Sequence, residues 1–227
     1  MEAPKEAISI ILRWRLRSEG GAPVPPTAGA GLGSLARPRE FDEAQALEGA
    51  LNLFWRHGYE AASLEQLLTA TGLSKSSLYQ TFGNKAELFA AALRSYQDGQ
   101  AADISHYLAS DKDPRRAFKR LLEAFTRAAP PDRKAWGCLT CNTAVELAPH
   151  DEAIARLVAD HHRRLEAIFA EAVIRGQQDG TIRRSLDPRS FASFLVAALS
   201  GLQVLARSGA NPRRIAAAAR MTLSVLD

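Results

Sequence analysis

The chain has 227 residues, of which 46% are hydrophobic and 24% charged, a composition typical of a soluble globular protein of one or two domains. Its two cysteines are too few and too close together for a secreted disulfide framework and favour a reducing cytoplasm. No segment reaches the roughly 18 uncharged apolar residues of a membrane span. The net charge is +4, yet residues 37–86 hold five basic and six acidic residues, so bulk charge does not indicate nucleic-acid binding there.

Residues 1–36 are predicted to be a disordered N-terminal extension. The segment 18–34 is rich in Gly, Pro, Ala and Ser and has too few large apolar side chains to form a core. A start codon assigned too far upstream is the alternative interpretation of this extension.

From Phe41 onward, apolar residues recur at helical spacing and no useful stretch alternates with period two, which predicts an all-α fold. A first helix extends through Phe54, and Gly58 is placed to end it with a left-handed cap. Ser63 and Gln66 form the S-x-x-Q pattern of a capping box, which predicts the start of a short second helix.

The next two helices complete a helix-turn-helix pattern. Ser74 can cap a third helix that ends at Phe82, and Lys85 begins a long fourth one. Two short helices joined through Gly72 after a longer helix are typical of this motif, in which the second short helix enters the DNA major groove. Hydroxyl, amide, ammonium and phenol groups on that helix can bond base edges or phosphates. The side chains expected to face outward are those of Ser74, Lys75, Ser76, Ser77, Tyr79 and Gln80.

An Asp or Asn before proline predicts the start of a later helix at 113–114, 187–188 and 211–212. The first residue supplies a capping side chain, and the proline lacks an N–H group that would have no partner in the first turn. Pro149 ends one further helix, and Asp151 is placed to cap the next one. About nine helices are expected in all.

The segment "FDEAQALEGALNLFWRHGYEAASLEQLLTATGLSKSSLYQTFGNKAELFAAAL" resembles the DNA-binding domain of TetR/AcrR-type transcriptional regulators. In that family an apolar first helix ends in Gly and an aromatic residue, and the recognition helix carries a Ser/Thr-aliphatic-Tyr pattern followed by Phe and Lys. The matching residues are Gly58, Tyr59, Ser63, Gly72, Leu73, Ser74, Leu78, Tyr79, Phe82, Lys85 and Leu88. The resemblance implies a helix-turn-helix DNA-binding domain at residues 37–97.

The same resemblance implies a role for each polar residue of this domain. Ser63, Tyr79 and Lys85 would contact phosphates, helped by helix N-terminal N–H groups. Base readout would fall to Gln80 and to the residues from Ser74 to Ser77, Lys75 included. A basic arm before the first helix would be formed by Arg37 and Arg39. For each of these residues, a solvated side chain without a DNA contact is the alternative.

Residues 98–227 resemble the effector-binding and dimerisation domain of one subgroup of the same family, through "WGCLTCNTAVELAPHDEAIARLV" and the segment "GQQDGTIRRSLDPRSFASFLVAALSGLQVLARSGANP". A helix at 136–148 is expected to border the effector pocket, and the long fourth helix is expected to relay occupancy to the DNA. Ordinary core packing is the alternative for each aromatic candidate. The expected pocket residues are Phe89, Tyr107, Phe118, Phe125, Trp136, Cys138, Cys141 and Asn142.

The stretch 191–206 carries no charge, so the helix it forms is expected to be covered on both sides, by its own domain and by a second copy. Together with residues 215–226 it would make a two-fold, four-helix homodimer interface. Membrane insertion is the rival interpretation, and the short length and polar or small residues at 193, 200, 201 and 203 oppose it. The expected interface residues are Phe191, Leu195, Leu199, Leu202 and Leu223.

Cys138 and Cys141 are one helical turn apart, so their sulfur atoms could share a metal ion or respond to an electrophile. A zinc site normally has four ligands, and a second cluster is missing, so no metal or cofactor is predicted. Two buried thiols without chemistry are the alternative, and nothing nearby in sequence obviously lowers the pKa of Cys138. His161 and His162 are further candidate ligands, of which one is expected to face solvent.

These patterns predict a cytoplasmic, homodimeric repressor that binds a double-stranded DNA operator and is released by a small effector, with an apolar or aromatic molecule favoured. A cysteine-based redox or electrophile sensor on the same scaffold is the alternative. An enzyme with Cys138 as nucleophile is disfavoured because no base and orienting group are placed around it. A helical adaptor without DNA binding is disfavoured by the intact run 74–85.

Overall fold

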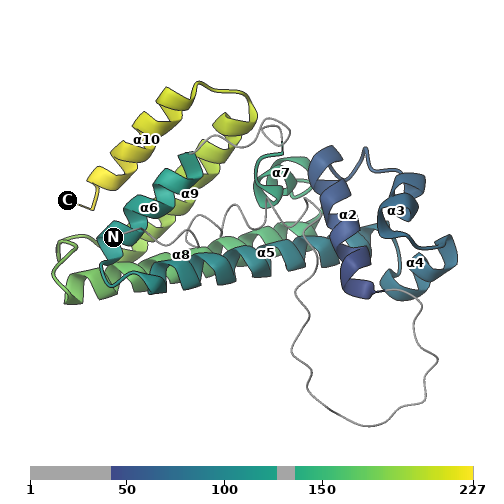
Figure 1. Ribbon diagram of the computed structural model, residues 1–227, viewed down its shortest axis with the longest axis horizontal. Coiled ribbons are helices and arrows are strands. Elements are labelled where there is room, and N and C mark those ends of the chain that lie inside the picture. The colour runs from purple at the N-terminus through teal and green to yellow at the C-terminus, as the bar shows by residue number, and fades with distance from the viewer. Residues whose placement is uncertain (1–41, 127–135, 227) are drawn as a thin grey trace, which may run out of the picture.

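The computed structural model describes residues 42–126 and 136–226, and within these ranges the chain forms nine α-helices and no strand (Figure 1). The predicted extension at 1–36 and the predicted arm residues Arg37 and Arg39 lie outside the described residues. The helices are α2 (Glu43–His57), α3 (Leu64–Thr71), α4 (Lys75–Phe82), α5 (Lys85–Ser110), α6 (Pro114–Thr126), α7 (Leu139–Glu146), α8 (Glu152–Gln178), α9 (Pro188–Arg207) and α10 (Pro212–Ser224).

The predicted N-terminal capping signals are confirmed, whereas Gly58 ends α2 with φ 83° and ψ 175°, outside the left-handed helical conformation expected there. Ser63 and Gln66 form a reciprocal capping box at α3, and Ser74 accepts a hydrogen bond from the Ser77 backbone N–H at α4. Asp151 accepts from two backbone N–H groups at the start of α8. Asp187 and Asn211 likewise cap α9 and α10, each followed by proline in the first turn. Local side-chain chemistry therefore determines where these helices begin.

Helix α7 is shorter than the helix expected at 136–148. Gly137 has a φ of 64°, a left-handed conformation that a glycine adopts without steric cost. Cys138 is extended and occupies the N-cap position of α7. The helix therefore begins at Leu139, and Cys138 lies at its N-terminal end instead of inside it.

Two hydrophobic clusters form the core, and α5 contributes to both. The first joins α2, α3 and α4 to the start of α5 and to α7, around Phe54, Leu78 and Phe89. The second joins the end of α5 to α6, α8, α9 and α10, around Phe118 and Phe169. In Figure 1, α5 and α8 run along the length of the molecule, with α2, α3 and α4 at one end and α10 at the other. The expected boundary between residues 97 and 98 falls inside α5, so one continuous helix links the two regions.

Within the described chain, α9 is the one helix long and apolar enough to cross a membrane by length and composition. One side of it is core, since α8 and α10 both pack against it and Leu195 is fully buried. Its other side exposes apolar side chains, among them Phe194 and Val204.

Candidate nucleic-acid interface and regulatory pocket

Helix α4 presents a polar, exposed face at the end of the molecule that is formed by α2, α3 and α4 (Figure 1). Leu78 is fully buried and fixes the helix to the core, whereas Tyr79 is 41% exposed. Lys75, Ser76 and Gln80 are also exposed. The outward face predicted for the recognition helix is thus available for contact with another molecule.

The serines at the start of α4 bond to one another. Ser74 Oγ accepts from the Ser77 backbone N–H at 3.1 Å and lies 3.0 Å from Ser76 Oγ and 2.9 Å from Ser77 Oγ. Capping is therefore the role of Ser74 that the contacts define, and any base contact must come from its remaining hydrogen-bonding capacity. The base-reading role of these serines stays a prediction.

Lys85 is held at the turn between α2 and α3. Its Nζ lies 4.5 Å from the centre of the Tyr59 ring and 3.5 Å from the backbone oxygen of Glu60. The cation–π contact keeps the ammonium group beside the N-terminus of α5, where a phosphate would be favoured. Sequence reasoning missed Asn84, which caps α5 in a capping box with Glu87, although the N-x-x-E pattern was present.

Helix α7 is bonded directly to the end of the molecule that is formed by α2, α3 and α4. One carboxylate oxygen of Glu146, Oε1, accepts from the backbone N–H groups of Tyr59 at 2.9 Å and Glu60 at 3.1 Å. At the other end of α7, the indole N–H of Trp55 donates to the backbone oxygen of Gly137 at 3.0 Å. The partners are more than 80 positions apart in sequence, so periodicity and local motifs could not predict these bonds.

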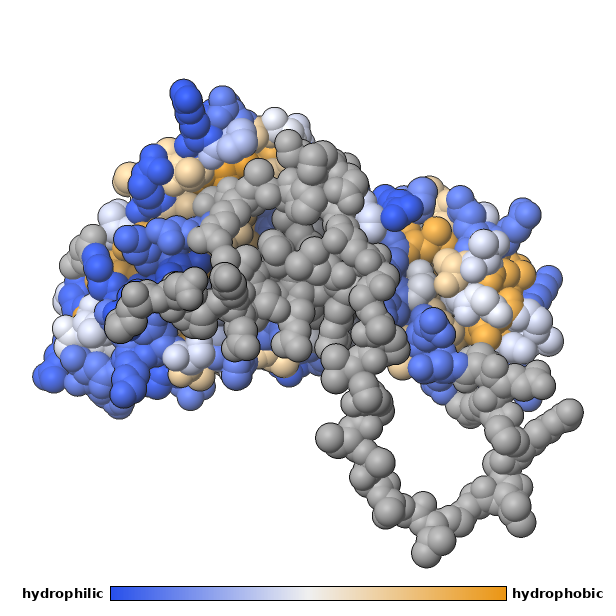
Figure 2. Space-filling view, viewed as in Figure 1, coloured by the Kyte–Doolittle hydropathy of each residue, from blue (hydrophilic) through white to orange (hydrophobic). Residues whose placement is uncertain are grey.

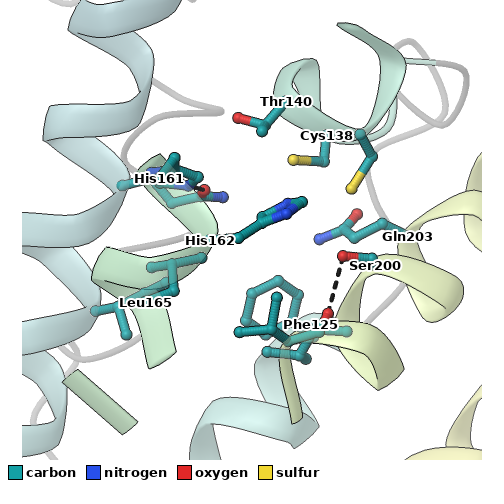
Figure 3. Close-up of a pocket in the computed structure, with 13 residues that line it drawn as sticks. Phe125, Cys138, Thr140, His161, His162, Leu165, Ser200 and Gln203 are labelled. Atoms are coloured by element: carbon teal, nitrogen blue, oxygen red, sulfur yellow. Dashed lines mark hydrogen bonds between the residues drawn. The ribbon is translucent and has the colours of Figure 1, made fainter. Parts of the chain in front are cut away.

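A cavity of about 30 Å³ lies between α5, α7, α8 and α9. Of the residues predicted to form an effector pocket, Phe125, Cys138 and Cys141 line it. Figure 3 shows Cys138 and Thr140 on one side, His161 and His162 reaching in from α8, and Ser200 and Gln203 on α9. Sequence analysis did not place the residues Gln100, Thr140, His161, His162, Ser200 and Gln203 in the pocket.

The other expected pocket residues do not line this cavity, although Phe89 lines a separate one of about 320 Å³. Phe89 packs edge-on against Phe54 in the first core cluster, with ring centres 5.0 Å apart. Tyr107 and Phe118 are buried in the second cluster. Trp136 packs against Trp55 with ring centres 5.5 Å apart, and its backbone oxygen accepts a hydrogen bond from the Asn142 side-chain amide at 2.8 Å. Aromatic residues at helical spacing formed core here.

Hydrogen-bond donors surround the sulfur atom of Cys138. The Tyr96 hydroxyl donates to it at 3.5 Å, and the Cys141 thiol and the first backbone N–H groups of α7 lie nearby, although none of those N–H groups makes a capping hydrogen bond to the Cys138 side chain. These donors, with the Cys141 thiol first, lower the pKa of Cys138 below its ordinary value despite burial. The pKa of Cys141 is raised because its proton is shared with Cys138 and because it is buried. The expectation that nothing lowers the pKa of Cys138 is therefore wrong.

His161 is buried and not solvent-facing, and its Nε2 atom lies 2.8 Å from Gln100 Oε1. Burial, helped by the neighbouring His162, lowers the pKa of His161 to about 4, so the ring is neutral at neutral pH. His162 is half-buried and lines the same cavity. Among the described residues, no group of three or more His, Cys, Asp or Glu side chains is arranged to hold a metal ion.

The expected dimer-interface residues are mostly inside the protomer. Phe191, Leu195, Leu199 and Leu202 are no more than 6% exposed and belong to the second core cluster, and Leu223 packs against that cluster. They are already covered by their own chain. Figure 2 shows apolar side chains among polar ones over the part of the molecule formed by α9 and α10. The large apolar side chains exposed on these helices are Phe194, Val204, Leu205 and Met221.

Comparison with known proteins places this architecture in a family. The family described as "Bacterial regulatory proteins, tetR family" matches residues 46–92, and the "Tetracyclin repressor-like, C-terminal domain" family matches residues 114–222. The chain is 33% identical over 191 residues to the HTH-type transcriptional repressor ComR of Escherichia coli (strain K12), covering 84% of this chain and 91% of ComR. The protein belongs to the TetR family of transcriptional regulators.

Other TetR-family proteins are similar over the same length. The uncharacterized HTH-type transcriptional regulator YezE of Bacillus subtilis (strain 168) is 30% identical, covering 85% of this chain and all (100%) of YezE. A solved structure of the regulator CifR with substituted cysteines, bound to a 26-base-pair operator, has a TM-score of 0.74 and 30% identity and covers 85% of this chain and 100% of CifR. As a TetR-family regulator the protein is not an enzyme, and it acts where DNA is, inside the cell.

Proposed function

We propose that this TetR-family regulator is a homodimeric repressor that binds a palindromic DNA operator through α4 of each protomer. The observation that carries the proposal is the exposed polar face of α4, held on a buried Leu78 in a complete helix-turn-helix. Two further findings support it: relatives such as ComR are named repressors, and the CifR structure holds operator DNA. A cytoplasmic location follows from the same proposal.

Within that operator complex, the exposed residues of the helix-turn-helix divide between two tasks. Phosphates are contacted by Lys85, which is held over the Tyr59 ring, and by the Tyr79 hydroxyl. Such contacts position the protein on DNA without reading its sequence. Gln80 on the exposed face of α4 reads a base, because its amide can pair with an adenine edge. Ser63 caps α3, and the backbone N–H groups at the N-terminus of that helix bind a phosphate.

Dimerisation uses the side of α9 and α10 that the protomer leaves uncovered. Phe194, Gly201, Val204 and Leu205 on α9 and Met221 on α10 are exposed there. Large apolar side chains at helical spacing on two neighbouring helices are stabilised when a second copy covers them. A two-fold dimer also supplies the second recognition helix that a palindromic operator requires.

A small molecule acting in the cavity between α7, α8 and α9 releases the operator. The cavity of about 30 Å³ is far below the roughly 300 Å³ of a site for a drug-sized ligand. A signalling molecule that acts in this cavity is therefore smaller than the apolar or aromatic effector that the sequence favoured.

The test of operator binding begins by sequencing the DNA fragments that the purified protein retains. The operator identified in this way is then titrated with the protein, and a scrambled duplex serves as the control. Lys85→Ala should weaken binding to all sequences and reduce the salt slope by about one. Tyr79→Phe should also weaken binding to all sequences. Gln80→Ala should relax preference at one base pair, by about 1–3 kcal/mol for a bidentate contact. Equal binding of operator and scrambled duplex by the wild-type protein at moderate salt would refute the proposal.

A further inference from the structure

We propose that Cys138 and Cys141 form a redox switch, in which a small hydroperoxide oxidises the two thiols to a disulfide and the operator is released. This inference rests on the proposed function and specifies the signal that acts in the cavity. It is carried by the arrangement of donors around one sulfur atom, by two buried polar atoms without partners, and by the bonds that join α7 to the DNA-binding end.

The position of Cys138 favours a thiolate. Cys138 is the N-cap residue of α7, an eight-residue helix, so its side chain lies at the positive end of the helix dipole. The Tyr96 hydroxyl donates to its sulfur at 3.5 Å, and the Cys141 thiol one turn along α7 lies beside it, although the backbone of α7 donates no capping hydrogen bond to it. A negative charge on this sulfur is therefore stabilised in place.

A chain of hydrogen bonds behind Cys138 orients the Tyr96 hydroxyl. His161 Nε2 lies 2.8 Å from Gln100 Oε1, so the imidazole N–H donates to that oxygen. The Gln100 amide then donates to the Tyr96 hydroxyl at 3.4 Å. With its lone pair engaged, the hydroxyl of Tyr96 donates its own proton to Cys138 Sγ at 3.5 Å. The pKa of Tyr96 is raised far above its ordinary value by burial, so the phenol stays protonated.

The cavity beside the sulfur fits a hydroperoxide. Its volume of about 30 Å³ corresponds to roughly two water molecules, the size of hydrogen peroxide. Two residues that line it each carry a buried polar atom without a hydrogen-bond partner, His161 Nδ1 and Thr140 Oγ1. With Nε2 protonated, Nδ1 accepts the O–H of a hydroperoxide, and the Thr140 hydroxyl donates to its oxygen.

The reaction balances with the hydroperoxide as the only oxidant. The thiolate of Cys138 attacks the terminal oxygen, the O–O bond breaks, and the alkoxide or hydroxide that leaves takes a proton from water. The sulfur is then a sulfenic acid. The sulfur of Cys141 displaces its hydroxyl group as water, and the S–S bond forms. Two thiols and one hydroperoxide thus yield one disulfide, one alcohol or water, and one further water.

The disulfide would change the contacts that connect α7 to the DNA-binding end. Once the disulfide forms, the sulfur of Cys138 is no longer a thiolate that accepts a hydrogen bond from the Tyr96 hydroxyl. The residue before it, Gly137, accepts a hydrogen bond from the Trp55 indole through its backbone oxygen. Trp55 also packs edge-on against Tyr96, with ring centres 5.1 Å apart. A rearrangement at Cys138 therefore acts at once on α2, which carries Trp55, and on α5, which carries Tyr96.

The experiment treats the reduced full-length protein with hydrogen peroxide and measures intact mass, free thiols and operator affinity on the same sample. The expected result is loss of both thiols and of two hydrogen atoms, together with at least tenfold weaker operator binding, reversed by dithiothreitol. Cys138→Ser should keep operator binding through the peroxide treatment. Cys141→Ser should stop at a sulfenic acid that dimedone traps.

Tyr96→Phe removes only the hydroxyl that donates to Cys138 Sγ and should slow the reaction of Cys138 with peroxide without preventing it. Peroxide treatment that leaves both thiols free, or that releases Cys138→Ser as readily as wild type, would overturn the switch. Failure of the untreated, reduced protein to bind any operator would instead overturn the proposed function, so the two failures are distinguishable.

Discussion

Replacing Glu146 with alanine should loosen the turn between α2 and α3 and weaken operator binding, although Glu146 lies on α7, outside the helix-turn-helix. A single oxygen of Glu146 accepts from the backbone N–H groups of Tyr59 and Glu60. The adjacent Gly58 makes room for this approach, since a Cβ atom there would lie 3.0 Å from the carboxylate oxygens. Lys85 rests on the ring of the same Tyr59.

The size of the effect follows from these two bonds. A hydrogen bond to a charged group contributes about 1.5–3 kcal/mol, and exposure of the turn reduces this, so we expect a loss of about 2 kcal/mol for the pair together. Chemical denaturation should show this loss in the free energy of unfolding. If all of it serves to hold the turn in its DNA-reading position, operator affinity should fall by up to about 30-fold.

Two variants serve as controls. Glu146→Gln keeps an oxygen that can accept both bonds and should retain most of the stability. Val145→Ala changes the neighbouring residue of α7, whose side chain is 76% exposed, and should have little effect. If Glu146→Ala matches Val145→Ala in both unfolding and operator titration, the two bonds do not hold the turn.

Three further predictions concern the dimer, the pH dependence and the packing of the helix-turn-helix. Phe194→Arg should give monomers in sedimentation experiments, whereas Ser95→Arg at an exposed site of α5 should leave dimers. The pKa of His161 is lowered to about 4 from 6.5, so its contribution to stability is complete above pH 6.5 and is lost as pH falls toward 4. This loss amounts to up to about 3 kcal/mol, and His161→Gln should remove it from the pH profile of unfolding. Gly49→Ala would bring a Cβ within 2.0 Å of the Ala70 backbone oxygen, so thermal unfolding should occur at a lower temperature as α2 and α3 separate.

The elements that the sequence predicted well are those determined by local chemistry. The capping box of Ser63 and the Asp-Pro and Asn-Pro starts of later helices involve residues within one turn of each other. The outward face of α4 follows from the spacing of Leu78 and its polar neighbours. Such contacts can be inferred without knowing how distant helices pack.

The lining of the cavity and the exposed apolar side of α9 depend on how the helices pack, which local sequence patterns do not determine. Leu195 and Phe194 are neighbours of similar hydrophobicity, yet one is fully buried and the other is 44% exposed. The absence of charge across this helix indicated that both of its sides are covered. It did not indicate which residues face the core of the protomer and which face outward. Likewise, Phe118 and Phe125 lie on the same helix, and only the contacts of α6 with other helices decide that Phe125 reaches the cavity.

Helix α7 offers a shorter route from the cavity to the DNA than the long α5 that the sequence favoured. Cys138 and Thr140 at its N-terminal end line the cavity, while Glu146 at its last residue holds the turn beside Tyr59. The helix is only eight residues long, about 12 Å at the usual rise per residue. A shift at the cavity therefore reaches the helix-turn-helix through one short, continuous element. Since Tyr96 of α5 also contacts Cys138 at the start of α7, both routes begin at the same sulfur atom, and the proposed oxidation of Cys138 would act on both.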